Sequence, residues 1–309
     1  MPMESIMKQS SVGLVADEET LAESGFYWRE RDGVRMLVFR SLEEAGFANG
    51  FSTRLGGVSS LQDVNSYPGD KGDVSDPDRI PIGTELNLAG FNEDSRENIY
   101  ENRRRFLSLF QKEYRLATAW QVHGDNIRFV REHGETGDAD ERADALVSNL
   151  DDILVGVKTA DCVPILVGDR VTGAYAAVHA GWRGTAQSIA MKALAKMKDE
   201  FGTDPKDAVC AIGPSAGCEL YEIGQDVIDA FAKNFAASEK YFTETRSGHA
   251  LVDLKAANRD QLIESGVLPE NVYVAPYCTM ERIDLFFSYR VEKKKFGRTG
   301  RLMSVIGKM

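Results

Sequence analysis

Three apolar segments separated by short polar turns occupy the middle of the chain, and a segment of helical period follows them. Residues 152–158, 164–169 and 173–179 each have the length and composition of a β-strand. From residue 187 to 201 the apolar side chains recur every three or four positions, as on one face of an amphipathic helix. Strands followed by a glycine turn and a helix predict a mixed α/β fold, in which helices cover the central sheets.

Other segments fill in this α/β pattern. Residues 27–31 and 34–40 predict a hairpin around the turn dipeptide Asp32-Gly33, and residues 95–112 predict a helix capped by Ser95. The glycine pair in FSTRLGGVSS, from residue 51, predicts a loop with close backbone approach, and the polar stretch 61–81 predicts a long loop, either a lid or an insertion. Further strands are predicted at 115–120, 127–131, 209–212, 272–275 and 286–290, and further helices at 224–235 and 256–265.

The length and the charge limit the domain organisation and the partners. We expect residues 1–24 to be loosely ordered and residues 25–309 to form one catalytic domain, monomeric or homodimeric. The 37 basic and 48 acidic residues give a net charge of −11, which argues against a nucleic-acid-binding surface and favours small-molecule or protein partners. No apolar run is long enough for a membrane span, and the start lacks the pattern of a secretory signal. We therefore expect a soluble cytoplasmic protein.

The four cysteines are far too few for a disulfide scaffold in a chain of this length, so reduced thiols are expected. Cys162, in TADC, follows a predicted strand, as do His123, in QVHGD, and His179, in VHAGWRG. Imidazole and thiolate are ligands that zinc prefers, and a catalytic zinc site keeps three protein ligands and an open position. The three residues could form such a site if their loops converge, or each could simply be packed in the core.

Seven segments in order along the chain resemble the laccase-domain, or YfiH-like, family. They are ANGFSTRLGGVSS, AWQVHGDNI, ADALVSN with LVGVKTADCVPILVGD, AAVHAGWRGTA, AIGPSAGCELYEIGQDV, VDLKAANRDQL and FFSYRVEKKKFGRTGR. These proteins were first labelled polyphenol oxidoreductases and later recognised as zinc-dependent purine nucleoside phosphorylases. The resemblance implies a layered α/β/β/α arrangement. It also implies cleavage of adenosine, inosine or methylthioadenosine by phosphate to free base and ribose 1-phosphate, with additional adenosine deaminase activity.

The resemblance also implies roles for particular residues. His123, Cys162 and His179 would bind zinc, with copper as the alternative metal, and would form the catalytic centre. Arg54, of STRLGG, would contact substrate or phosphate, with a surface salt bridge as the less favoured alternative. Asp161 would either orient a ligand or cap the following turn. Arg183, where a glycine-bounded turn opens a helix, would hold an anion, or would instead stack on Trp182 or pair with a carboxylate.

Two positions depart from the family pattern. Asn49 stands where the family often has histidine, so any role of that imidazole is absent. Cys218 is followed by Glu219 and Leu220 where a second cysteine often precedes the tyrosine, which makes a structural role for Cys218 the better interpretation. Cys210 and Cys278 are expected to be buried thiols, and His133 and His249 to be solvated loop residues.

Other functions stay open at this stage. Cys162 activated by His179 could serve a cysteine hydrolase, for example one that edits cell-wall peptide precursors. Two histidines and one cysteine could also hold copper, with polyphenol oxidation as a side activity, but four histidines are too few for the three-copper cluster of a multicopper oxidase. A non-catalytic protein with a structural zinc is disfavoured, because a closed site needs a fourth ligand.

Overall fold

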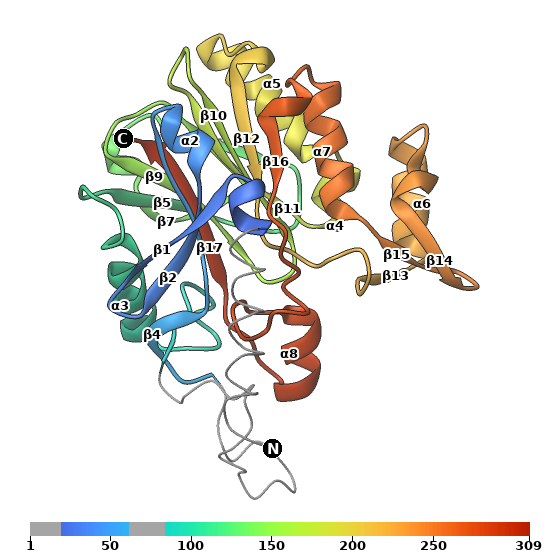
Figure 1. Cartoon of the computed structure of the whole chain (residues 1–309), viewed down its shortest axis with the longest axis horizontal. Helices are drawn as coiled ribbons and strands as arrows, with labels where there is room; N and C mark the ends of the chain where they lie inside the picture. The colour runs from blue at the N-terminus through green and yellow to red at the C-terminus, as the bar shows by residue number, and fades with distance from the viewer. Residues whose placement is uncertain (1–19, 62–83) are drawn as a thin grey trace, which may run out of the picture.

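The computed structural model describes residues 20–61 and 84–309, and in this part of the chain two β-sheets lie face to face with helices on their outer faces (Figure 1). The layers run from helix α3 (Arg96–Leu107) through a seven-stranded sheet and a six-stranded sheet to helices α5 (Ile189–Phe201) and α7 (Leu254–Glu264). The predicted α/β/β/α layering is confirmed. Each sheet buries one face against the other sheet and its second face beneath helices.

The seven-stranded sheet joins both ends of the described chain. Its order is β1-β2-β3-β17-β9-β5-β7, in which β5 runs parallel to both its neighbours and the other pairs are antiparallel. The strands are β1 (Phe26–Arg31), β2 (Val34–Phe39), β3 (Phe47–Ser52), β17 (Leu302–Lys308), β9 (Ile153–Thr159), β5 (Arg115–Trp120) and β7 (Gly137–Arg142). The predicted hairpin around Asp32-Gly33 is its β1–β2 edge, where both turn residues have positive φ.

The six-stranded sheet has the order β16-β12-β10-β11-β8-β6. Its strands are β16 (Val272–Val274), β12 (Ala208–Ile212), β10 (Val163–Asp169), β11 (Tyr175–Ala180), β8 (Ala145–Ser148) and β6 (Ile127–Phe129). In β10 the side chains alternate between the two layers, because Leu166 packs between the sheets whereas Ile165 and Val167 pack beneath the helices. Such two-sided burial explains why the middle of the sequence is continuously apolar.

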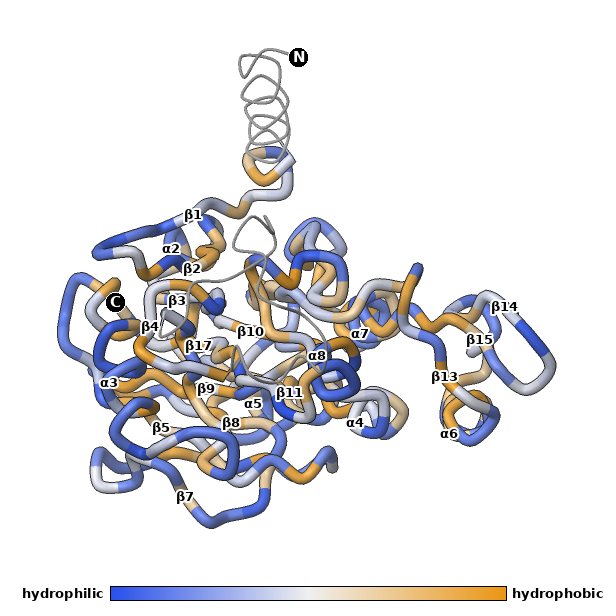
Figure 2. Tube along the Cα trace, turned by 90° about the horizontal axis from the view of Figure 1, so that it is seen from below, coloured by the Kyte–Doolittle hydropathy of each residue, from blue (hydrophilic) through white to orange (hydrophobic). Residues whose placement is uncertain are grey.

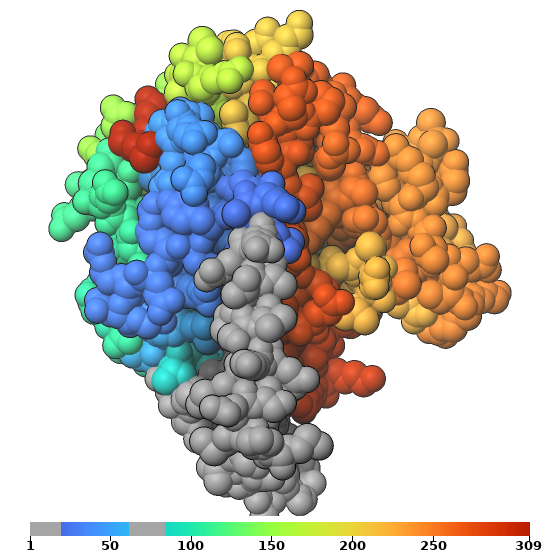
Figure 3. Space-filling model, viewed as in Figure 1, coloured from blue at the N-terminus to red at the C-terminus, as the bar shows by residue number. Residues whose placement is uncertain are grey.

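A smaller unit extends from the helical side of the molecule. It comprises the three-stranded sheet β13-β15-β14 and helix α6 (Gln225–Asn234). Its strands are β13 (Glu222–Gly224), β15 (His249–Val252) and β14 (Phe242–Arg246). Figures 1, 2 and 3 all show this unit projecting beyond the body formed by the two large sheets. Other elements of the described chain include the short helices α2 (Arg40–Glu44) and α4 (Trp182–Ala186), the strand β4 (Leu55–Ser59) and the helix α8 (Tyr289–Phe296).

Three predicted elements need correction. The predicted strand 286–290 is wrong, because Ser288 caps helix α8 by accepting a hydrogen bond from the N–H of Val291. The segment predicted as a loop from residue 51 forms the end of β3 and all of β4. Its close backbone approach is nevertheless real, since a Cβ on Gly57 would lie 2.0 Å from the carbonyl oxygen of Glu85. The helix predicted at 187–201 is present as α5 but begins only at Ile189, because Ser188, with a φ of 60°, separates it from α4.

Two predicted segments lie mostly outside the described residues. They are the loosely ordered start, 1–24, and the loop 61–81, of which residues 20–24 and Leu61 are described. A search of the described helices for one that is both long and apolar enough to span a bilayer finds none.

Candidate functional site

His123, Cys162 and His179 come together where strands of both sheets end. His123 lies in the turn after β5, Cys162 precedes β10, and His179 is the penultimate residue of β11. Their nitrogen and sulfur ligand atoms all lie within 4.8 Å of one another, and the two imidazole rings meet edge to face with centroids 4.9 Å apart. In the described part of the chain, no other set of three or more His, Cys, Asp and Glu side chains converges in this way.

Backbone geometry turns two of these side chains toward the third. His123 has a φ of 59° and Asp161, immediately before Cys162, has a φ of 85°, so each loop bends through the left-handed region. Such conformations are rare for residues other than glycine and are found where the surrounding structure fixes a functional side chain. The third ligand needs no such turn, because His179 sits in β11 opposite Pro164 of β10.

A buried aspartate holds the two histidines in place. The Asp144 carboxylate lies 2.7 Å from Nδ1 of His179 and accepts hydrogen bonds from the backbone N–H groups of Val122, His123 and Gly124. Burial raises the pKa of Asp144, but its hydrogen bonds and the charge of His179 outweigh burial, so the net pKa lies below the usual value. A carboxylate on Nδ1 leaves Nε2 of His179 as the ligand atom, the arrangement common around protein-bound zinc.

The donor set fits a zinc ion. Gly181 leaves room beside all three ligands, because a Cβ there would lie 3.1 Å from Sγ of Cys162 and 3.1 Å from Cδ2 of His123. Burial raises the pKa of the Cys162 thiol, yet the charge of His179 and a hydrogen bond from His123 reverse the shift and lower it. The lowered pKa favours the thiolate, which is the form that binds metal.

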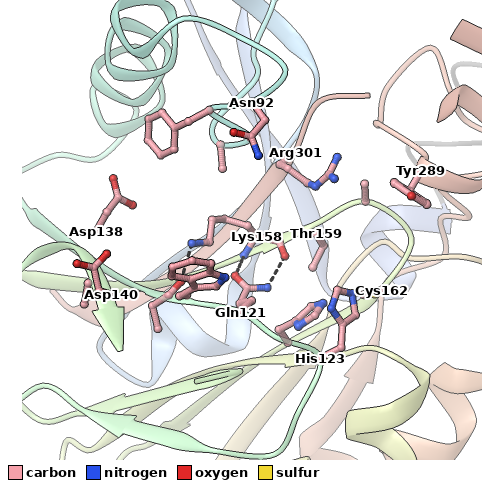
Figure 4. Close-up of a pocket in the computed structure, with 18 residues that line it drawn as sticks. Asn92, Gln121, His123, Asp138, Asp140, Lys158, Thr159, Cys162, Tyr289 and Arg301 are labelled. Atoms are coloured by element: carbon pink, nitrogen blue, oxygen red, sulfur yellow. Dashed lines mark hydrogen bonds between the residues drawn. The ribbon is translucent and has the colours of Figure 1, made fainter. Parts of the chain in front are cut away.

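The triad forms one wall of a cavity of about 750 Å³ (Figure 4). Strand β5 and its turn contribute Trp120 and Gln121, and the cations of the cavity wall are Lys158 and Arg301. Its remaining lining residues are Ala89, Gly90, Phe91, Asn92, Ala119, Asp138, Ala139, Asp140, Thr159, Ala160 and Tyr289. The volume is that of a pocket for a small organic molecule.

The amide of Gln121 ties the triad turn to strand β9. It donates to the carbonyl oxygen of Lys158 and accepts from the backbone N–H of Lys158, each at 2.7 Å (Figure 4). The Lys158 ammonium donates to the carbonyl oxygen of Ala119, and burial lowers the pKa of Lys158 to about 8.

The family described as multi-copper polyphenol oxidoreductase laccase matches residues 48–308. The chain belongs to this laccase family. It is 34% identical over 230 residues to a purine nucleoside phosphorylase of Bacteroides thetaiotaomicron, an alignment that covers 72% of this chain and 84% of the relative. It is also 36% identical over 186 residues to the adenosine deaminase RL5 of an unknown prokaryotic organism, over 58% and 71% of the two chains.

A solved structure shares the fold of this laccase-family chain. The crystal structure of YlmD from Geobacillus stearothermophilus superposes with a TM-score of 0.77 at 30% identity, over 92% of this chain and 98% of that one. The chain is also 30% identical over 272 residues to the purine nucleoside phosphorylase YfiH of Escherichia coli, over 88% of this chain and 98% of the relative, which confirms the expected resemblance to YfiH-like proteins.

Arg54, predicted to contact substrate or phosphate, lies outside the lining of the cavity. Its guanidinium is 1% exposed, pairs with the carboxylates of Glu85 and Glu292, and donates to the carbonyl oxygen of Ile283. It also stacks on Phe287, with 4.5 Å between the guanidinium carbon and the ring centroid. These contacts link β4 to the C-terminal segment and give Arg54 a structural position, buried rather than at the surface.

The other two predicted substrate residues also lie outside the cavity lining. The Asp161 carboxylate is buried and accepts from the hydroxyl of Thr279 and from the backbone N–H of Arg290 in the first turn of α8. It thus caps a helix and fixes the loop that carries Cys162. Arg183 is exposed and stacks on Trp182, 4.2 Å from the ring centroid, which is the alternative that the sequence left open.

The structure shows the burial and contacts of the residues for which the sequence predicts no catalytic role. The Asn49 side chain is buried, and it accepts from the backbone N–H of Phe39 and donates to that residue's carbonyl oxygen. Cys210 is buried as expected, whereas Cys278 is half-buried and its sulfur accepts from the N–H of Gly217. Cys218 is exposed. Of the two histidines expected to be solvated, His133 is exposed and His249 is half-buried in β15.

The sequence analysis did not predict three residues of the site, which are Asp144, Lys158 and Arg301. Asp144 directly precedes the apolar strand β8, and Lys158 is the one charged residue within the apolar strand β9. These two residues could have been predicted from their position inside or beside a buried strand. Burying a charged group costs free energy unless it is paired, so such a residue indicates an ion pair, a hydrogen-bond network or a functional site. Arg301 follows the glycine of a basic segment, and nothing local distinguishes it from its neighbours.

Proposed function

We propose that this protein is a zinc-dependent purine nucleoside phosphorylase. It would cleave adenosine, inosine or methylthioadenosine with phosphate to the free base and ribose 1-phosphate, and would also deaminate adenosine. The observation that carries the proposal is the His123–Cys162–His179 triad opening into a cavity of about 750 Å³. The names of the relatives, purine nucleoside phosphorylase and adenosine deaminase, support the same chemistry.

Three ligands and an adjoining cavity favour a catalytic over a structural metal site, because structural zinc takes four protein ligands. When bound, zinc supplies Lewis acidity to the reacting groups in the cavity. Asp144 then keeps His179 oriented, and Gly181 leaves the ligands free of steric contact. Copper is the alternative metal for this donor set, and polyphenol oxidation would then be a side activity.

The cavity wall suits a purine. Trp120 lies in the lining with 56% of its surface exposed, and Phe91 lies there with 36% exposed. Large exposed aromatic faces beside a cavity offer a stacking surface for a base, and stacking of a base on an aromatic ring contributes roughly 1–3 kcal/mol. We therefore assign base stacking to this wall of the cavity.

We also place the activity in the cytoplasm. All four cysteines are free thiols in the structure, which supports a reducing compartment.

A second candidate function is a cysteine or zinc hydrolase that edits cell-wall peptide precursors. The observation that favours it is the Cys162 thiol facing two imidazoles, the arrangement of an activated nucleophile. Alkylation separates the two functions. With zinc bound, a ligand thiolate should be protected from iodoacetamide, whereas a nucleophile should be labelled at the same rate with and without the metal.

The deciding experiment is turnover by the zinc-loaded full-length chain. Adenosine and inosine are incubated with and without phosphate, and free base, inosine and ribose 1-phosphate are followed by chromatography alongside metal analysis. We expect base release to require phosphate, and His179→Ala to abolish both base release and deamination. His133→Ala, an exposed histidine outside the cavity lining, is the matched control. Phosphorolysis that persists in His179→Ala with no metal bound contradicts the proposal.

A further inference from the structure

Arg301 presents a fixed cation to the cavity. Its Nη1 atom donates to the carbonyl oxygens of Thr299 and Gly300, at 3.1 and 2.9 Å. The guanidinium carbon lies 5.6 Å from the ring centroid of Tyr289, and the side-chain stem passes Gly90, where a Cβ would lie 3.8 Å from Cγ of Arg301. These contacts hold the plane of the guanidinium without neutralising its charge.

The other edge of this guanidinium is free. Among the described residues, Nε and Nη2 of Arg301 have no hydrogen-bond acceptor and no carboxylate lies within ion-pair distance. Arg54 and Arg103, by contrast, both form ion pairs with carboxylates. A guanidinium edge with two parallel N–H donors matches two oxygens of a phosphate or carboxylate, and such bidentate pairs are strong and directional.

The position of Arg301 fits the attacking anion of the proposed reaction. Figure 4 shows Arg301 across the cavity from Cys162 and His123, with Asn92 and Tyr289 on either side. If adenine binds with C6 at the triad, as deamination there requires, the ribose and the phosphate that attacks it lie on the far side of the base, away from the triad.

We infer that Arg301 binds inorganic phosphate as the second substrate of the cavity, apart from the metal ligands. This inference rests on the proposed phosphorylase function. In that reaction an oxygen of hydrogen phosphate bonds to the anomeric carbon of the ribose as the bond to N9 of the purine breaks. The electron pair goes to the base, the proton of hydrogen phosphate ends on the base, and Arg301 holds two of the three phosphate oxygens that do not bond to the ribose.

Lys158 is a less suitable phosphate ligand, although it lines the same cavity. Its ammonium donates to the carbonyl oxygen of Ala119, and Figure 4 shows it directed to the side of Asp138 rather than toward Arg301. Arg54 is neutralised by two carboxylates, and Arg183 lies outside the cavity lining. The free guanidinium edge distinguishes Arg301 from all three.

The test is calorimetric titration of inorganic phosphate into the zinc-loaded full-length chain. We expect Arg301→Gln to weaken phosphate binding about 10- to 100-fold, and Arg301→Lys, which keeps the charge but loses the planar edge, to fall between Arg301→Gln and wild type. Arg131→Gln, an exposed arginine outside the cavity lining, should bind phosphate like wild type. Thermal unfolding checks that each variant is folded. If Arg301→Gln does not fold, the phosphate affinity of Arg301→Lys decides the test.

A cobalt-substituted sample separates this subsite from binding on the metal. Phosphate bound at Arg301 should leave the visible cobalt spectrum unchanged. A spectral shift that persists in Arg301→Gln, wild-type affinity in both Arg301 variants, or no phosphate binding by wild type would each overturn the inference.

Turnover distinguishes this inference from the proposed function. If Arg301-dependent phosphate binding occurs but inosine yields no free base, the phosphorylase proposal fails and the anion subsite stands. If ribose 1-phosphate forms with the same KM for phosphate in wild type and Arg301→Gln, the function stands and the subsite is wrong. The expected result is a raised KM for phosphate in Arg301→Gln.

Discussion

The Asp144 carboxylate lies 2.7 Å from Nδ1 of His179 and also accepts the backbone N–H of His123 at 2.9 Å. One buried side chain therefore orients two residues of the triad that are 56 positions apart in the sequence, one through its ring and one through its main chain. The third residue, Cys162, depends on a different carboxylate, because Asp161 anchors its loop to helix α8. The triad is thus held from two sides by carboxylates that are not part of it.

We expect Asp144→Asn to weaken zinc binding about 10- to 100-fold, the range typical of partners that orient metal ligands. One carboxylate oxygen contacts Nδ1 of His179 and the N–H of His123, and the other accepts from the N–H groups of Val122 and Gly124. An amide keeps only one acceptor oxygen, so one of these two pairs loses its acceptor. Zinc affinity is measured by competition with a chromophoric chelator, and circular dichroism checks the fold. Asp199→Asn, an exposed carboxylate on α5, is the control. Unchanged affinity in a folded Asp144→Asn protein would show that the hydrogen bonds do not orient the ligands.

Gly181→Ala tests whether the ligands need the space beside them. A Cβ would lie 3.1 Å from Sγ of Cys162 and 3.1 Å from Cδ2 of His123, and neither atom can move without disturbing the triad. We expect zinc affinity to fall about tenfold or more, as for other losses of ligand support. Gly134→Ala is the matched control, because nothing lies within 4 Å of a Cβ there. Equal zinc affinities of the two variants would mean that the triad tolerates displacement.

The convergence of His123, Cys162 and His179 could be predicted from the sequence, but the residues around them could not. His123 and His179 stand out because histidine is rare in this chain and both precede a glycine-containing turn. Asp144 lies 35 residues from His179 in sequence, and only the pairing of β8 with β11 brings them together. Arg54 shows the converse: its motif indicated a functional role, whereas its buried carboxylate partners come from segments 31 and 238 residues further along the chain.

For the fold, local patterns predicted strands and helices well where both faces are buried or where a cap is present. The three central strands, the first hairpin and the helix after Ser95 are examples. Strand β17 was missed because it is specified by its neighbours β3 and β9, far away in sequence, rather than by its own composition. The sequence predicts a strand at 286–290, but hydrogen bonds from backbone N–H groups to Ser288 and Asp161 begin a helix there.

Arg54→Met should reveal whether Arg54 acts in the fold or on the substrate. The substitution leaves the buried carboxylates of Glu85 and Glu292 without their cation, so we expect the free energy of unfolding to fall by about 3–5 kcal/mol. Urea denaturation measures the loss. Arg104→Met, which removes an exposed ion pair with Glu101 on α3, should change stability little. A stable Arg54→Met protein that no longer binds phosphate would instead restore the substrate role indicated by the sequence.

Lys158 gives the fold a pH dependence of known sign. Burial lowers its pKa from the usual 10.5 to about 8, although Asp138 opposes the shift. Below pH 8 the ammonium is charged in both states and the folded protein carries the full cost of burying it. Between pH 8 and 10.5 the unfolded chain binds the proton that the folded chain has lost, so this group's contribution to stability rises with pH.

Lys158→Met lacks this titration. We therefore expect wild type to gain about 2–3 kcal/mol of unfolding free energy relative to Lys158→Met between pH 7.5 and pH 10. Urea denaturation of both proteins at the two pH values measures the difference, and contributions from all other titrating groups cancel in the comparison. If the two proteins change in parallel, the Lys158 ammonium is not desolvated in the folded state. A difference of opposite sign would mean that the Asp138 carboxylate dominates over burial.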